Sequence, residues 1–302
     1  MPEFRYPLAI ACHDAGAANI AMAWLDERRL SDCRAVMAGP ARQLWTDRFG
    51  TQLLVESIEE GLAGTAMLLS GTGWASDFEH RARQMAAEAG VFSVAVLDHW
   101  VNYADRFVRD GVTVWPDEFW VADEYALHEA GRVFPGQTIR PHSNEYLKEM
   151  VSQIPLAAAA PQLELLYVLE PIRIDWGRGR PGEFQALDYL LARLEPLEPA
   201  RKLTIRLRLH PSEPLGKYDE WIAAQGRPNI RLDYSENIAQ AMAGAKWVAG
   251  CESFALTMAL EAGRSVICTL PPWASACRLP HRGLIHLKDI LDHEILQALL
   301  TT

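Results

Sequence analysis

The strongest constraint on the fold is the stretch KWVAGCESFALTMALEAGRSVICTLP at residues 246–271. A short apolar run, a Gly-x-x-Ser turn, a helical stretch and a second apolar run predict a strand, a turn, a helix and a strand. This order puts Ser253 and the amide of Phe254 at a helix N-terminus, which is a site that binds phosphate. The segment LRLHPSE at 207–213 ends another strand. If these strands are parallel, both motifs open at the carboxyl edge of one sheet, where open α/β sheets bind ligands.

The rest of the chain repeats this alternation. A length of 302 residues suggests about two domains. We therefore predict an α/β protein with two Rossmann-like domains facing across a cleft, at 1–154 and 163–302, joined by a linker at 155–162. The predicted strands are 8–11, 34–37, 52–55, 66–70, 92–97, 118–122, 165–169, 203–209 and 230–233, besides those of the opening motif. The predicted helices are 18–28, 41–49, 58–62, 76–89, one around Ala126, 144–153, 183–194, 217–225 and 238–244.

Charge and hydropathy exclude several classes of function. The net charge of -10 argues against nucleic acid or an anionic membrane as the main partner, since both require a basic surface. No apolar run approaches the roughly 20 residues that span a bilayer, so we expect no integral membrane segment. The first residues do not have the layout of a signal peptide, and the expected location is the cytoplasm.

The cysteines do not suggest a metal site. Cys12, Cys33, Cys251, Cys268 and Cys277 are scattered without a CxxC pair or Cys/His ligand spacing. Free thiols in a reducing compartment are the expected state, with no metal or other cofactor.

The loop CHDAGAAN at 12–19 follows the first predicted strand. Asp14 is the first candidate for a catalytic base, and His13 is its alternative, because a carboxylate or imidazole at a strand end can accept a proton. Asp14 could instead only cap the following helix. Asp98, at the end of a later strand, is the second candidate base.

Two more loops are predicted at the same edge. Gly71, Thr72 and Gly73 follow a strand, although such a glycine pair is most often a plain turn. In LDHWVNYADRF, His99 and Trp100 combine aromatic and polar groups that suit sugar recognition on the acceptor side. The alternative is that this segment only packs or acts as a lid.

A Gly/Arg-rich loop, GRGRPG at 177–182, follows the first strand of the second half. Arg178 and Arg180 could bind a pyrophosphate through forked hydrogen bonds. A solvated loop without a ligand is the alternative.

The sequences LRLHPSE and IRLDYSENIAQAMAGAKWVAGCESFALTMALEAG resemble the C-terminal half of GT-B glycosyltransferases. The closest resemblance is to bacterial sialyltransferase and glycerophosphotransferase-like enzymes with a His-Pro motif. It implies that His210, with Pro211, contacts the donor phosphate and that the turn of Glu252, Ser253 and Phe254 cradles it. It also implies a ribose contact for Glu261. This sequence has no clear acidic pair followed by glycine of the sialyltransferase kind, and Glu252-Ser253 replaces a Ser-Ser pair.

The leading hypothesis is a metal-independent glycosyltransferase. It would move a sugar, of which a nonulosonic acid is one option, from a CMP- or UDP-linked donor to a surface glycan or related acceptor. His210 would assist the departure of the phosphate. One alternative is a UDP-sugar 2-epimerase or nucleotide-sugar hydrolase, in which His13 and Asp14 activate water or shuttle protons. Another is a non-catalytic nucleotide-sugar-binding subunit.

Overall fold

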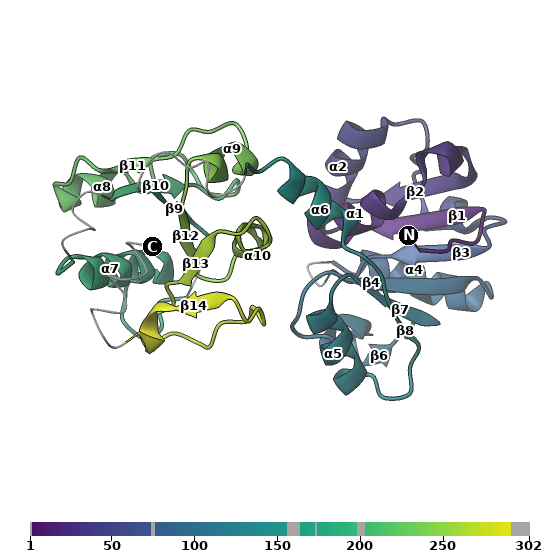
Figure 1. Cartoon of the computed structure of the whole chain (residues 1–302). Helices are drawn as coiled ribbons and strands as arrows, with labels where there is room; N and C mark the ends of the chain where they lie inside the picture. The colour runs from purple at the N-terminus through teal and green to yellow at the C-terminus, as the bar shows by residue number, and fades with distance from the viewer. Residues whose placement is uncertain (1, 74–75, 156–163, 173, 198–202, 291–302) are drawn as a thin grey trace. The chain divides into compact units, whose positions relative to one another are not determined.

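The computed structural model describes residues 2–73, 76–155, 164–172, 174–197 and 203–290 (Figure 1). The chain divides into two compact units, Met1–Lys148 and Glu149–Thr302. The division falls within helix α6 (Glu145–Ser152). Apart from Pro155, the linker predicted at 155–162 lies outside the described residues.

The described residues of the first unit form a six-stranded parallel sheet in the order β2-β1-β3-β4-β7-β8. Its strands are β1 (Leu8–Cys12), β2 (Cys33–Met37), β3 (Met67–Ser70), β4 (Phe92–Leu97), β7 (Glu118–Val121) and β8 (Ile139–Pro141). Its helices are α1 (Ala15–Trp24), α2 (Gly39–Phe49), α3 (Ile58–Leu62), α4 (Phe78–Glu88) and α5 (Glu124–Val133), with α6 after them. Two short 3-10 helices (Glu27–Asp32, Ala104–Phe107) and the hairpin β5 (Val108–Arg109) and β6 (Val112–Thr113) complete it.

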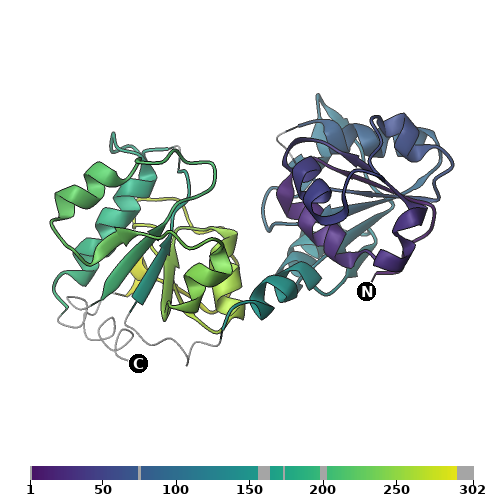
Figure 2. The ribbon, with the colours of Figure 1, turned by 90° about the horizontal axis from the view of Figure 1, so that it is seen from above.

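Alternating residues of each strand bury opposite faces of this sheet, as the strand period of two requires. Leu8 and Ile10 of β1 pack in a core with α1 and α2, whereas Ala9 and Ala11 pack with α3 and α4. Figure 2 shows the resulting layers, with the sheet of each unit between helices. The polar loops are therefore left at the strand ends, which is where a ligand can reach them.

The described residues of the second unit repeat this design in the order β11-β10-β9-β12-β13-β14. Its strands are β9 (Glu164–Val168), β10 (Thr204–Arg208), β11 (Ile230–Leu232), β12 (Trp247–Gly250), β13 (Ser265–Cys268) and β14 (Leu284–His286). Its helices are α7 (Gly182–Leu194), α8 (Asp219–Gln225), α9 (Ile238–Ala243) and α10 (Phe254–Glu261), followed by a 3-10 turn at Leu287–Asp289. The main core packs Leu165, Tyr167 and Trp247 of the sheet against α7 and α8.

Each sheet has a topological switch point, at which the strand order reverses and the loops diverge. In the first unit it lies between β1 and β3, and in the second unit between β9 and β12. The carboxyl ends of these strands carry His13-Asp14, Gly71–Gly73, Glu170 and Ser253. The switch points are therefore the places where open α/β sheets take ligands.

The predicted fold class is confirmed, because both six-stranded sheets are parallel and Rossmann-like. Two element predictions are wrong. Residues 52–55 make a single parallel bridge, Ala35 with Leu54, because a turn follows Gly50 and leaves too few residues for a ladder. The helix predicted at 18–28 begins at Ala15 and ends at Trp24, since Leu25 is already extended. None of the described helices has the length and apolarity to cross a bilayer.

Candidate functional site

The loop after β1 carries an acid–base pair. The Asp14 Oδ1 atom lies 2.6 Å from His13 Nδ1, and the side chains are 28% and 23% exposed, so a substrate can reach them. Asp14 occupies the N-cap position of α1, but its side chain makes no capping hydrogen bond to the described helix. The role of a plain cap is thus not realised. A Cβ atom built on Gly73 would lie 2.2 Å from Asp14 Oδ2. The Asp14 carboxylate therefore packs directly against the backbone of the loop that follows β3.

Asp98, at the end of β4, lies beside this pair. Its Oδ1 atom accepts a hydrogen bond of 2.7 Å from Arg106 Nη1, and the side chain is 18% exposed. A Cβ atom on Gly16 would lie 2.0 Å from Asp98 Oδ2. The carboxylate therefore packs against the first turn of α1, where the helix dipole stabilises negative charge. The same Arg106 nitrogen donates to Thr72 Oγ1 at 3.0 Å, which ties the β3 and β4 loops together. Thus His13, Asp14, Asp98 and Gly71–Gly73 come together at one switch point.

A buried carboxylate, that of Glu79, is hydrogen-bonded to the backbone of this cluster. Glu79 of α4 is fully buried, and its Oε1 atom accepts the His13 backbone N–H at 2.8 Å. Burial raises the pKa of Glu79. Its Oε2 atom has no hydrogen-bond partner among the described residues. The sequence pattern does not single out Glu79, because an acidic residue in the first turn of a helix is normally solvated and interacts with the helix dipole.

The residues predicted to bind an acceptor differ in their exposure. Trp100 is only 8% exposed, and its indole N–H donates to both carboxylate oxygens of Asp123, at 3.1 and 3.0 Å. Asp123 in turn caps α5 by accepting the Ala126 N–H. Trp100 therefore packs against the fold, as in the alternative interpretation of this loop. His99 lies beside it, with its Nδ1 atom accepting the Trp100 N–H at 3.0 Å.

In the second unit, Ser253 caps α10, and its Oγ atom accepts the Ala255 N–H at 3.3 Å. The preceding Glu252 N–H donates to Glu170 Oε1 at 2.7 Å, across the switch point. The Glu252 carboxylate accepts the Arg278 backbone N–H at 3.0 Å and its Nε–H at 2.8 Å. Burial is the main cause that raises the pKa of Glu170 to about 7, and the negative charge of the neighbouring Glu252 adds to it. The Ser253 turn is therefore held by two carboxylates that sequence reasoning did not connect.

His210 ends its strand with one ring nitrogen already engaged. Its Nδ1 atom accepts the Ser212 backbone N–H at 3.2 Å and lies 2.8 Å from the Ser212 hydroxyl. Because a backbone N–H only donates, the neutral ring carries its proton on Nε2. His210 can therefore offer an Nε2–H to an anion. Pro211 is exposed in the same turn, which closes with Glu213 N–H donating to the His210 carbonyl at 2.9 Å.

A cavity of about 330 Å³ lies beside this turn, at the carboxyl ends of β9 and β10. Lys217 is a cation in its wall and pairs with Glu183 and Glu213. Hydrogen bonds to those carboxylates raise the pKa of Lys217 despite its desolvation. The lining residues are Pro171, Ile172, Pro181, Glu183, Ser212, Glu213, Pro214 and Lys217.

The remaining predicted donor-binding residues have other partners or lie elsewhere. The Arg178 guanidinium stacks over the Trp273 ring, 3.7 Å from its centroid, and Arg180 pairs with Asp188 of α7. Both charges are thus engaged within the unit. Glu261 is exposed at the last residue of α10. At a rise of about 1.5 Å per residue it lies roughly 12 Å along the helix from Ser253.

Comparison with known proteins adds evidence on the fold. No protein-family model and no curated protein matches the sequence. Among solved structures, the UDP-GlcNAc 2-epimerase of Methanocaldococcus jannaschii is similar, with a TM-score of 0.64 and 10% identity over 98% of this chain and 92% of that one. A proposed UDP-N-acetylglucosamine 2-epimerase of Listeria monocytogenes gives a TM-score of 0.65 and 11% identity over 99% and 89%. At such identities the likeness shows the fold alone, which is that of two Rossmann-like units.

Proposed function

We propose that this protein is an enzyme acting on a nucleotide sugar. The first unit carries acid–base groups, and the second unit carries groups that can bind a nucleotide. The His13–Asp14 pair beside Asp98 is the observation that carries the proposal. Three proton-exchanging groups at a switch point suit proton transfer to and from a bound substrate. A purely binding subunit has no need for such a partly exposed acid–base cluster.

In the second unit, the groups available to a diphosphate are donors. They are the Nε2–H of His210, the Ser253 hydroxyl at the start of α10, and the Lys217 ammonium, which has three N–H donors and two carboxylate partners. Hydrogen-bond donors of this kind stabilise a phosphate leaving group without a metal ion. What supports the proposal is the chemical type of these groups and not their relative positions, because His210 and Ser253 follow different strands.

We favour 2-epimerisation of a UDP-sugar, or hydrolysis of the same class of substrate, over transfer to an acceptor. Inversion of a carbon centre requires one group to remove a proton and another to return one, and no second substrate. Because the two groups must act on opposite faces of the carbon, the hydrogen-bonded His13–Asp14 pair can supply one of them, and Asp98 is the candidate for the other. The solved structures of similar architecture with TM-scores above 0.6 include two proteins named as UDP-GlcNAc 2-epimerases.

Glycosyl transfer remains the second candidate, because the Asp14 side chain is not used as a helix cap and can accept a proton from an acceptor hydroxyl. The donor would then be CMP- or UDP-linked and the acceptor a glycan. The resemblance to the sialyltransferase type stays a prediction.

The test is product analysis with a panel of UDP- and CMP-sugars in D₂O, without an acceptor. Epimerisation predicts a new diastereomer carrying solvent deuterium at the inverted carbon. Hydrolysis predicts free sugar and nucleotide. Transfer predicts turnover only after a glycan acceptor is added. Saturable binding of a nucleotide sugar with no turnover under any of these conditions would contradict the proposed catalysis.

A further inference from the structure

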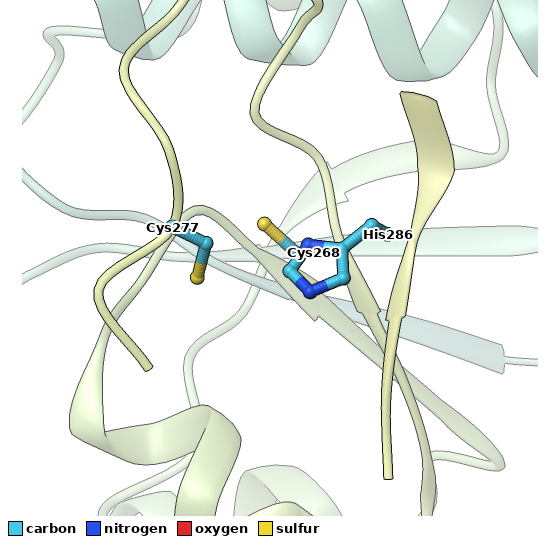
Figure 3. Close-up of side chains that lie close together, drawn as sticks. All are labelled: Cys268, Cys277 and His286. Carbon is cyan, nitrogen blue, oxygen red and sulfur yellow. The ribbon is translucent and has the colours of Figure 1, made fainter. Parts of the chain in front are cut away.

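A cluster of soft ligands lies at the outer part of the second sheet. The ligand atoms of Cys268, Cys277 and His286 all lie within 4.8 Å of one another (Figure 3). Cys268 ends β13, His286 ends β14, and Cys277 belongs to the loop between them. Sequence spacing did not reveal this group, because eight residues lie between Cys268 and Cys277 and eight more lie between Cys277 and His286.

The sheet register explains why these side chains meet. Cys268 and His286 are direct partners in the parallel pairing of β13 with β14, so their side chains project from the same face. Cys277 then returns over that face. Two thiols and an imidazole are the ligand types that Zn²⁺ takes in proteins.

The carbonyl oxygen of Cys251 lies close to both sulfurs. The Cys268 Sγ–H donates to it at 3.0 Å, and the Cys277 Sγ lies 3.9 Å from it. In a tetrahedral zinc site, bond lengths of about 2.3 Å to sulfur and about 2.1 Å to oxygen put these two atoms roughly 3.6 Å apart. The carbonyl is thus near the fourth corner of a tetrahedron, where it or a water molecule can complete the site. One further observation points to a missing partner: the His286 Nδ1 atom is buried without a hydrogen bond to any described residue.

We propose that Cys268, Cys277 and His286 form a Zn²⁺ site that ties the loop at 269–283 to the edge of the second sheet. This goes beyond the proposed function and does not depend on it. β14, which follows this loop, pairs with the sheet through three residues. Arg278, the neighbour of Cys277, donates to Glu252 in the Ser253 turn. A metal ion at Cys277 would therefore also hold the arginine that supports this turn.

The test uses the full chain, reduced, freed of metal with a chelator, desalted and titrated with Zn²⁺. We expect one zinc ion per chain by elemental analysis after gel filtration, and a higher Tm with zinc, because a ligand bound only by the folded state stabilises it. Co²⁺ in place of zinc should give the sulfur-to-cobalt charge-transfer absorption that reports thiolate ligation.

Three variants separate this site from adventitious binding. Cys277→Ser and His286→Asn should each weaken zinc binding by at least about 10-fold, the lower end of the effect of disturbing a metal's supporting shell. Cys33→Ser, a buried thiol in the first unit, should bind zinc like the wild type. Circular dichroism verifies that the variants are folded. Cys277→Ser replaces a partly exposed loop residue and is the safer variant.

Two outcomes would overturn the proposal. One is a folded, reduced wild-type chain that takes up no more zinc than Cys277→Ser. The other is a disulfide between Cys268 and Cys277 in peptide maps of the chain purified without reductant, together with no zinc uptake after reduction.

Discussion

The two switch points share a topology but offer opposite chemistry. The first, between β1 and β3, gathers His13, Asp14 and Asp98 with Arg106 as a cationic partner of Asp98. At the second, between β9 and β12, the carboxylates of Glu170 and Glu252 accept hydrogen bonds from within the unit, and Ser253 caps the N-terminal end of α10. Fold alone would not separate them, since function depends on the groups at each site. The difference fits the proposed proton transfer in the first unit and the proposed anion binding in the second.

The largest expected effect concerns the first switch point, where the proposal places proton transfer. Asp14→Asn should lower kcat by about 10²–10⁴-fold, the contribution of a positioned acid or base, while the Kd for a UDP-sugar stays the same. Steady-state kinetics and calorimetric titration measure the two. Asp98→Asn is the matched variant. If Asp14→Asn is fully active and Asp98→Asn is dead, the base is Asp98; if both are active, the acid–base role of this cluster is wrong.

His210→Ala tests the second half. Loss of the Nε2–H donor to a phosphate should lower kcat/KM by about 10²–10³-fold, in the range of removing one donor from a charged transition state. The fold should persist, because His210 is only partly buried and its contacts are local to its turn. Unchanged kcat/KM with every nucleotide sugar that turns over would remove His210 from the site.

Ser253→Ala tests whether the Ser253 side chain binds a ligand in addition to capping α10, and Asn237→Ala is its control. Ser253 caps α10 and Asn237 caps α9, each by accepting a backbone N–H. Both variants should lose about 1 kcal/mol of unfolding free energy through the lost cap. Only Ser253→Ala should also weaken nucleotide-sugar binding, because α9 does not begin at the switch point. Equal affinities for the two variants would show that Ser253 is a cap and nothing more.

The last prediction is a pH dependence at Glu170. Its folded-state pKa, about 7, lies above the value of an unfolded glutamate, so its protonated form is favoured by folding. That contribution to stability is complete below the unfolded pKa and is lost as the pH rises through about 7. Glu170→Gln keeps the acceptor for the Glu252 N–H but does not titrate. The Tm of the wild type relative to this variant should therefore fall between pH 5 and pH 8; an equal Tm difference at both values would contradict the assignment.

The sequence by itself determined the parallel α/β class, most element positions and the strand-end locations of Asp14, Asp98, His210 and Ser253. These follow from local information: apolar runs of strand length, helical stretches between them and polar residues directly after each strand. Parallel pairing then brings the loops to one edge of each sheet.

Only the tertiary structure decided which polar groups are free and which are engaged. Trp100 and Asp123 are 23 residues apart, and Glu79 lies 66 residues from the His13 amide that it accepts. The Cys268, Cys277 and His286 cluster likewise depends on the register of β13 with β14. Such contacts are set by strand order, register and burial rather than by neighbours in the chain. Local sequence patterns do not specify which distant side chain a given polar residue will contact.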